Sequence, residues 1–334
     1  MAELRFELKE PAAGRLPVLD ELKGLAILLV VLYHAGGVLV WNNHLHGDLG
    51  VDMFVILSGL GLALSGHSGG ARRFLTRRLW RIMPTYWIAL TLYAWAGTHF
   101  LEHHYSTADL LLHYVGIHGW FGDAYAVSIS DPFWFITLIL TLYVLFCFFR
   151  PLLERPAQLL LVGSFLSTGV AFACFFWNQP GVFGFLALRI PGFFVGLLLG
   201  RWLRSGRLVL PVGVPLATAL FVFVYVPYTQ GIVFHPTVAG LAVMGFYGYT
   251  LRPVLGAGVR RGLKFLGDHS LEIFLLHQPL IREYNFYLQG RWLQINHPGP
   301  AGLIVGMVIG LAVTLVASVE LHRLLQKLPF PAKA

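Results

Sequence analysis

Two residues in the first apolar stretch have the types and spacing needed for proton-transfer chemistry. His34 lies inside an apolar run that begins at Lys23, eleven residues earlier. In a helix, eleven residues make about three turns, so both side chains are expected on one face, about 16 Å apart along the axis. Polar side chains in lipid are costly and usually functional. Because an imidazole can take up a proton near neutral pH, His34 is the candidate general base and Lys23 a candidate cation at the membrane surface.

Asp52 opens the second apolar run, and its position fits two roles. As a carboxylate beside a histidine it would orient His34. As an acid in the first turn it would instead stabilise the N-terminus of its own helix. His44 and His46 lie in the link between the two runs. Such a pair without further ligands is more typical of solvated side chains, so no metal site is predicted.

Five arginines fall within ten positions, residues 72–81, just before Pro84 opens the third apolar run. Arg77, Arg78 and Arg81 occupy neighbouring turns and are expected to converge on one polyanion. The planar guanidinium fork suits phosphate. Anionic lipid headgroups would also satisfy the cluster. Simple anchoring at the membrane needs fewer charges, so a phosphorylated soluble ligand is favoured.

Three further polar candidates lie in later apolar runs, and a fourth, Ser58, lies in the second run. Arg189 enters an apolar helix, and Glu272 and His277 share the run 266–283, with Glu272 nearer its start. Each could take part in chemistry or pair with another span. Ser58 fits a close-packed helix contact better than a nucleophile. Arg189 and Ser58 are candidates for stabilising an oxyanion.

The composition indicates an all-α, polytopic membrane protein. Of 334 residues, 57% are hydrophobic and 12% charged, against about 25% charged in soluble proteins. Cys147 and Cys174 lie in apolar runs and are expected to be small buried residues without a disulfide. The segment 109–121 is too short to span and is expected at the outer interface or partly re-entrant. About ten transmembrane spans are predicted, at residues 24–41, 51–66, 84–101, 132–149, 157–177, 183–200, 208–226, 236–251, 266–283 and 300–320.

The positive charges predict the orientation of these spans. Nearly all of the 24 lysines and arginines fall in the N-terminal segment, in alternate links and in the tail. By the positive-inside rule both termini are cytoplasmic, and residues 1–334 form one membrane domain with short cytoplasmic ends, 1–22 and 321–334. The net charge of +8 is therefore a topology signal, and no nucleic-acid partner is expected.

Six motifs resemble, in order, those of membrane acyltransferase family three: LDELKGLAILLVVLYHA, GVDMFVILSG, FLTRRLWRIMPTYWIAL, FWFITLILTLY, LALRIPGFFVGLLLG and LGDHSLEIFLLHQPL. Lys23 stands where the family more often has arginine, and lysine also supplies a positive charge there. Phe133 and Gln326 stand near positions where many members have histidine and glutamate, so those roles are not transferred.

The resemblance implies an integral-membrane acyltransferase of the bacterial inner membrane. Such an enzyme would move an acyl group, most often acetyl, from cytosolic acyl-coenzyme A to a hydroxyl of a cell-envelope polysaccharide, lipid-linked sugar or small molecule. Lys23, Arg77, Arg78 and Arg81 would hold the phosphates of the donor. His34, held by Asp52, would act as general base, or would form a transient acyl-histidine.

Two other functional classes fit parts of the pattern. A glycan or lipid transporter would use His34, Glu272 and His277 as a proton relay along its path. That interpretation explains the arginine cluster less well. A structural or partner-binding membrane subunit would tolerate the loss of His34.

Overall fold

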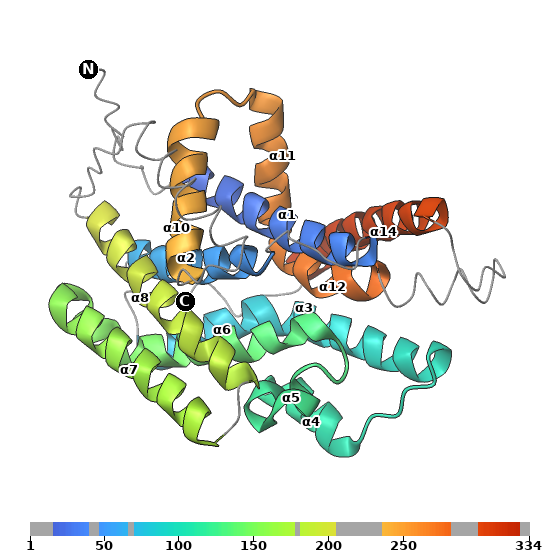
Figure 1. Cartoon of the computed structure of the whole chain (residues 1–334), viewed down its shortest axis with the longest axis horizontal. Coiled ribbons are helices and arrows are strands. Elements are labelled where there is room, and N and C mark those ends of the chain that lie inside the picture. Colours follow the sequence, from blue (N-terminus) through green and yellow to red (C-terminus); the bar gives the residue numbers. More distant parts are fainter. Residues whose placement is uncertain are drawn as a thin grey trace.

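The computed structural model describes residues 16–39, 47–65, 70–177, 181–204, 236–281 and 300–327. The described residues form an all-helical fold (Figure 1), which confirms the predicted class. The α-helices are α1 (Pro17–Leu39), α2 (Asp48–Leu64), α3 (Ala71–Phe100), α4 (Thr107–Val115), α5 (Asp123–Ala126), α6 (Trp134–Phe149), α7 (Pro156–Trp177), α8 (Gly181–Arg204), α10 (Pro236–Phe246), α11 (Ala257–Asp268), α12 (Ser270–Ile281) and α14 (Pro300–Gln326).

Shorter turns connect or extend these helices. The 3-10 turns are η1 (His118–Phe121), η2 (Asp131–Phe133) and η3 (Arg150–Glu154), and η4 (Tyr247–Leu251) is a π-helical turn at the end of α10. The short segment predicted at 109–121 consists of α4 and η1. Gly116 joins them in the left-handed conformation, with a φ of 81°, and this backbone conformation favours glycine.

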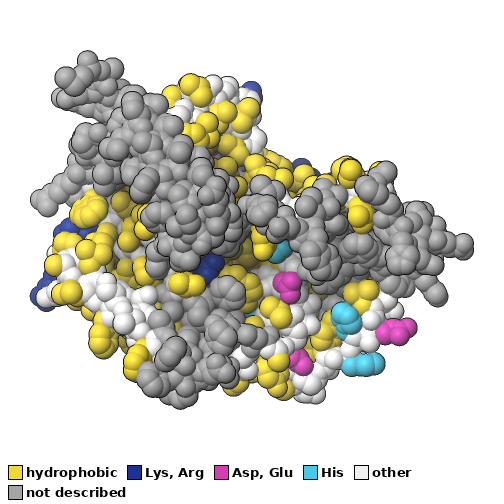
Figure 2. Space-filling view, in the orientation of Figure 1, with side chains coloured by type: hydrophobic (Ala, Val, Ile, Leu, Met, Phe, Trp, Pro, Cys, Tyr) yellow, Lys and Arg dark blue, Asp and Glu magenta, His cyan; other side chains and the backbone are white. Residues whose placement is uncertain are grey.

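The apolar composition of the helices agrees with a membrane environment. Within the described residues, two segments are long and apolar enough to cross a membrane, Asp131–Glu154 and Gly302–Gln326. Shorter apolar helices cover Leu49–Leu64, Pro156–Val170 and Ser270–Ile281. On the face drawn in Figure 2, hydrophobic side chains spread over the coloured surface, and lysines and arginines lie mainly at its left and upper edges. The predicted span 208–226, like His44 and His46, lies outside the described residues.

Two predicted boundaries are wrong in ways that matter for the site. The span predicted at 266–283 is two helices, because α11 ends at Asp268 and α12 begins at Ser270. The break falls at the polar residues Asp268, His269 and Ser270, which the predicted span included. In addition, α3 begins at Ala71, so Pro84 lies inside the helix and does not open it. The arginine segment therefore forms the first turns of a 30-residue helix and does not form a link.

Glycines allow the helices that carry the candidate residues to pack closely. Helix α1 packs against α2, α11 and α12, and α2 packs against α8. At the crossing of α1 and α11, a methyl group at Gly24 would overlap the carbonyl oxygen of Leu263, and one at Gly267 would overlap that of Asp20. Small residues at such contacts let two backbones approach. This crossing sets Lys23 of α1 near the end of α11.

The crossing predicts a difference between two glycines of α11. Gly267→Ala should lower the stability of the protein by about 1–3 kcal/mol, since the added methyl meets backbone that cannot move aside. A methyl group at Gly262 would meet no described atom within 4 Å, so Gly262→Ala should keep or slightly raise the stability, as alanine favours helix. Thermal unfolding in detergent measures both. Equal melting temperatures for the two variants would contradict the close crossing.

Candidate functional site

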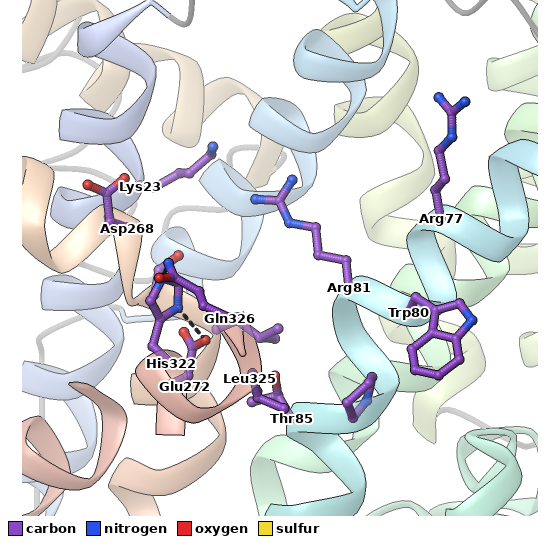
Figure 3. A pocket seen from close by; sticks show the side chains of 14 residues that line it. Lys23, Arg77, Trp80, Arg81, Thr85, Asp268, Glu272, His322, Leu325 and Gln326 are labelled. Atoms are coloured by element: carbon purple, nitrogen blue, oxygen red, sulfur yellow. Dashed lines mark hydrogen bonds and ion pairs between the residues drawn. The ribbon is translucent and has the colours of Figure 1, made fainter. Parts of the chain in front are cut away.

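A cavity of about 410 Å³ lies where α1, α3, α12 and α14 meet the end of α11. Its walls carry charges of both signs, as Figure 3 shows. Lys23, Arg77 and Arg81 provide the cations, and Asp268 and Glu272 provide the carboxylates. Because these residues come from three segments far apart in the sequence, the cavity is a product of the tertiary fold.

The cationic wall is built by α1 and α3. Arg77 and Arg81 lie one turn apart on α3, and Figure 3 shows the side chains of Lys23 and Arg81 extending toward one another from their two helices. The Nζ atom of Lys23 is also 3.3 Å from Oδ1 of Asp20, a buried carboxylate. Three cations around one cavity can bind a polyanion such as a pyrophosphate.

Helices α12 and α14 contribute to the cavity a carboxylate–imidazole pair that the sequence did not reveal. Oε1 of Glu272, which is buried, lies 2.8 Å from Nδ1 of His322 on α14 (Figure 3). Nε2 of His322 lies 2.8 Å from Nε2 of Gln326, and the ring of His269 lies 4.7 Å from that of His322. In sequence, His322 is one polar residue among several at the end of an apolar run. The fold places it in the cavity lining and pairs it with a residue 50 positions away.

Arg78 lies away from this cavity. Its guanidinium carbon is 5.6 Å from the ring centre of Phe74 and 5.4 Å from that of Tyr143, at cation–π distance. Burial lowers the pKa of Arg78, because desolvation disfavours the charged form, and the hydroxyl of Tyr143 offsets part of that effect. Ser58 donates a hydrogen bond to the hydroxyl of the same Tyr143, at 3.4 Å. These two candidates therefore belong to the packing between α2, α3 and α6.

The structure brings His34 and His277 together. Their ring centres are 5.0 Å apart with the ring planes tilted by 56°. His34 is half-buried on α1, and His277 is fully buried on α12. Nδ1 of His277 lies 2.8 Å from the carbonyl oxygen of Phe274 and 3.1 Å from that of Ile273. Two histidines from helices far apart in the sequence thus form one pair.

Helices α1 and α12 both run from the cavity to this histidine pair. Lys23 lines the cavity, and His34 lies about 16 Å further along α1. Glu272 lines the cavity too, and His277 lies about 7.5 Å further along α12. The cavity lining does not include either histidine among the described residues. The arrangement therefore places a polyanion site and a pair of imidazoles along the same two helices.

Asp52 and Arg189 form a buried ion pair between α2 and α8. Nε of Arg189 is 3.5 Å from Oδ1 of Asp52, and the exposed fractions of the two side chains are 4% and 2%. The guanidinium carbon of Arg189 also lies 5.3 Å from the ring centre of Trp134. Two candidates that the sequence analysis considered separately are therefore each other's counter-ion.

This pair predicts a strong effect on stability. Asp52→Asn should destabilise the protein by about 3–5 kcal/mol, because it removes the counter-charge that Asp52 provides to the buried guanidinium of Arg189. The double variant Asp52→Asn/Arg189→Gln should lose less than the sum of the two single variants. Melting temperatures of the wild type, the two single variants and the double variant in detergent measure this double-mutant cycle. Strictly additive losses would show that the pair does not stabilise the fold.

No three His, Cys, Asp or Glu side chains converge as possible metal ligands within the ranges that the structure describes.

Comparison with known proteins adds a family match. The family model described as an acyltransferase domain matches residues 16–322. A 69-residue stretch is 46% identical to a protein of Komagataeibacter xylinus that carries the provisional description of a membrane-bound transacylase, BcsY. That stretch covers 20% of this chain and 16% of the relative, so the match spans about a sixth of the relative's length. No solved structure matches the chain.

Proposed function

Because the chain belongs to membrane acyltransferase family three, whose members are multi-pass membrane acyltransferases, we propose that it uses acyl-coenzyme A as its donor. The acyl group, most often acetyl in this family, passes to a hydroxyl of a cell-envelope glycan, a lipid-linked sugar or a related small molecule. The protein lies in the bacterial inner membrane with both termini in the cytoplasm. The name of the K. xylinus relative, a membrane-bound transacylase, supports this assignment.

The observation that carries the proposal is the cationic wall of the cavity. Lys23, Arg77 and Arg81 surround a space of about 410 Å³ at the end of α3 that carries the arginine-rich segment. By the positive-inside rule this end faces the cytoplasm, where coenzyme A is found. The phosphates of coenzyme A are polyanionic, and arginine binds phosphate with several charge-assisted hydrogen bonds. A transporter of a neutral glycan would have no need for such a wall.

The histidine pair supports the second half of the proposal. His34 acts as the general base: it takes the proton of the acceptor hydroxyl, and the hydroxyl oxygen attacks the thioester carbonyl carbon. The carbon–sulfur bond then breaks, the thiolate of coenzyme A leaves with the electron pair, and the proton on His34 passes to it. Reaction through a transient acyl-histidine would instead place the acyl group on His34 before the hydroxyl attacks.

The direct test is saturable binding of coenzyme A to the detergent-solubilised protein. We expect binding that weakens as the ionic strength rises, because charges at a partly open cavity are screened by salt. Inside-out membrane vesicles from the native cells, which contain the native acceptor, should also release free coenzyme A from acetyl-coenzyme A only when the protein is present. Movement of a glycan or lipid in the absence of any acyl donor would favour a transporter instead.

A further inference from the structure

Nδ1 of His277 is held by the backbone of α12, whereas Nε2 has no hydrogen-bond partner among the described residues. The two atoms close to its Nδ1 are the carbonyl oxygens of Ile273 and Phe274, which can only accept hydrogen bonds. Nδ1 therefore carries the hydrogen and donates it. In the neutral ring this leaves Nε2 as the acceptor nitrogen. The backbone of α12 thus selects the tautomer of His277.

The acceptor nitrogen of His277 is buried without a hydrogen-bond partner among the described residues. The side chain is 0% exposed, and Nε2 is one of the buried polar atoms that no described group satisfies. Buried polar groups are nearly always hydrogen-bonded, so each exception calls for an explanation. The ring that lies against it is that of His34.

We propose that His277 is a positioning residue for His34, with its Nε2 accepting the ring N–H of His34 so that the other nitrogen of His34 faces the acceptor hydroxyl as a base. This inference rests on the proposed acyl transfer. A hydrogen bond of about 2.9 Å between two nitrogens, extended by the radius of a ring at each end, gives a centroid separation of about 5 Å. The observed 5.0 Å matches that separation, and a turn of the half-buried His34 ring completes the bond.

His34 and His277 have different roles in the proposed reaction. When His34 takes the hydroxyl proton it becomes a cation, and its other N–H donates to Nε2 of His277, which spreads the positive charge. His277 keeps its own proton throughout, so the proton passes from the hydroxyl to His34 and then to the departing thiolate. In many enzymes a base activates the nucleophile, and a third group orients that base. His277 has the role of this third group. Asp52, which the sequence suggested for it, is the counter-ion of Arg189.

The other charged and titratable groups near α12 are engaged elsewhere. From η2, Asp131 accepts a hydrogen bond from Gln278. From α3, Tyr93 donates to the carbonyl oxygen of Leu276 at 2.7 Å. From α14, His322 binds Glu272 near the cavity. From α11, Asp268 pairs with Lys264. In the described part of the chain, His34 of α1 is therefore the titratable group whose ring lies against that of His277.

Two variants of His277 and one control test the inference. His277→Phe keeps a ring but removes the acceptor, and His277→Gln keeps an oxygen that can accept. His113→Phe is the control, because His113 is also fully buried, with Nδ1 2.8 Å from a backbone carbonyl and an Nε2 without a partner among the described residues. Each full-length variant is produced in native cells that lack the gene. The rate of coenzyme A release from acetyl-coenzyme A is measured in inside-out vesicles across a pH series, and coenzyme A binding in detergent.

We expect His277→Phe to lower kcat about 10- to 100-fold without changing the KM for acetyl-coenzyme A, the range found for groups that orient a metal-bound histidine. The acid limb of its pH profile should move to lower pH, because the cationic form of His34 loses the acceptor that stabilises it. His277→Gln should recover part of both effects. His113→Phe should match the wild type once the amount of folded protein is equalised.

Three outcomes would overturn the inference. The first is a full kcat in His277→Phe, and the second is a lowered kcat with an unmoved acid limb. The third is a loss in His113→Phe as large as that in His277→Phe. If His277→Phe does not fold, the pH profile of His277→Gln decides. Failure of the proposed function is separate, because it would appear in the wild type as absent coenzyme A binding or absent thiol release.

Discussion

The His34→Ala protein is expected to bind coenzyme A as tightly as the wild type and to transfer no measurable acyl group. General base catalysis contributes about 10²- to 10⁴-fold to a rate, and without the imidazole the hydroxyl must be deprotonated by water. The cavity that would hold the donor is lined by other residues, so its affinity should not change. Release of coenzyme A in vesicles measures the rate, and a direct binding assay in detergent measures the Kd.

Tyr33 provides a matched control on the same helix. It neighbours His34 and is 38% exposed, so Tyr33→Phe should retain full turnover. Retained turnover in His34→Ala would exclude His34 as the general base. Incubation with acetyl-labelled coenzyme A separates the two mechanisms: label on the wild-type protein that is absent from His34→Ala would indicate the acyl-histidine route, and its absence from both would indicate direct transfer.

The Arg81→Gln protein is expected to bind coenzyme A about tenfold to a hundredfold more weakly. A hydrogen bond to a charged group contributes about 1.5–3 kcal/mol, and each 1.4 kcal/mol is a factor of ten in Kd. Arg77→Gln should show a loss of the same kind. Lys23→Gln should lose less, because part of the charge of Lys23 is already balanced by Asp20. Isothermal titration of the detergent-solubilised protein with coenzyme A measures each Kd.

Arg72→Gln is the control for this series. Arg72 lies on the same helix and in the same charged segment and is exposed, as Arg77 and Arg81 are, but it lies outside the cavity lining. If the arginines serve only anionic lipid headgroups, Arg72→Gln and Arg81→Gln should behave alike toward coenzyme A. That equality would contradict the donor site, and a selective loss in Arg81→Gln would support it.

The sequence by itself determined the class and the family of this protein. The long apolar runs specify helices in lipid, because in a bilayer the backbone must satisfy its own hydrogen bonds. The motifs around Lys23 and His34 identified the acyltransferase family, and the match over residues 16–322 confirms it. These features are local: each depends on residues within a few helical turns. The helical period is also a local property, so the sequence alone placed Lys23 and His34 on one face of a helix.

Only the tertiary structure decided which of the candidates act together. Arg77 and Arg81 line the cavity while Arg78 packs on aromatic rings, although all three lie in neighbouring turns of α3. The pairs that define the site join residues far apart in sequence: His34 with His277, and Glu272 with His322. Such pairs depend on where helices cross, and the crossings depend on small residues such as Gly24 and Gly267, which let two backbones approach. The sequence pattern of one helix does not show which other helix packs against it, so these partners became visible only in the folded chain.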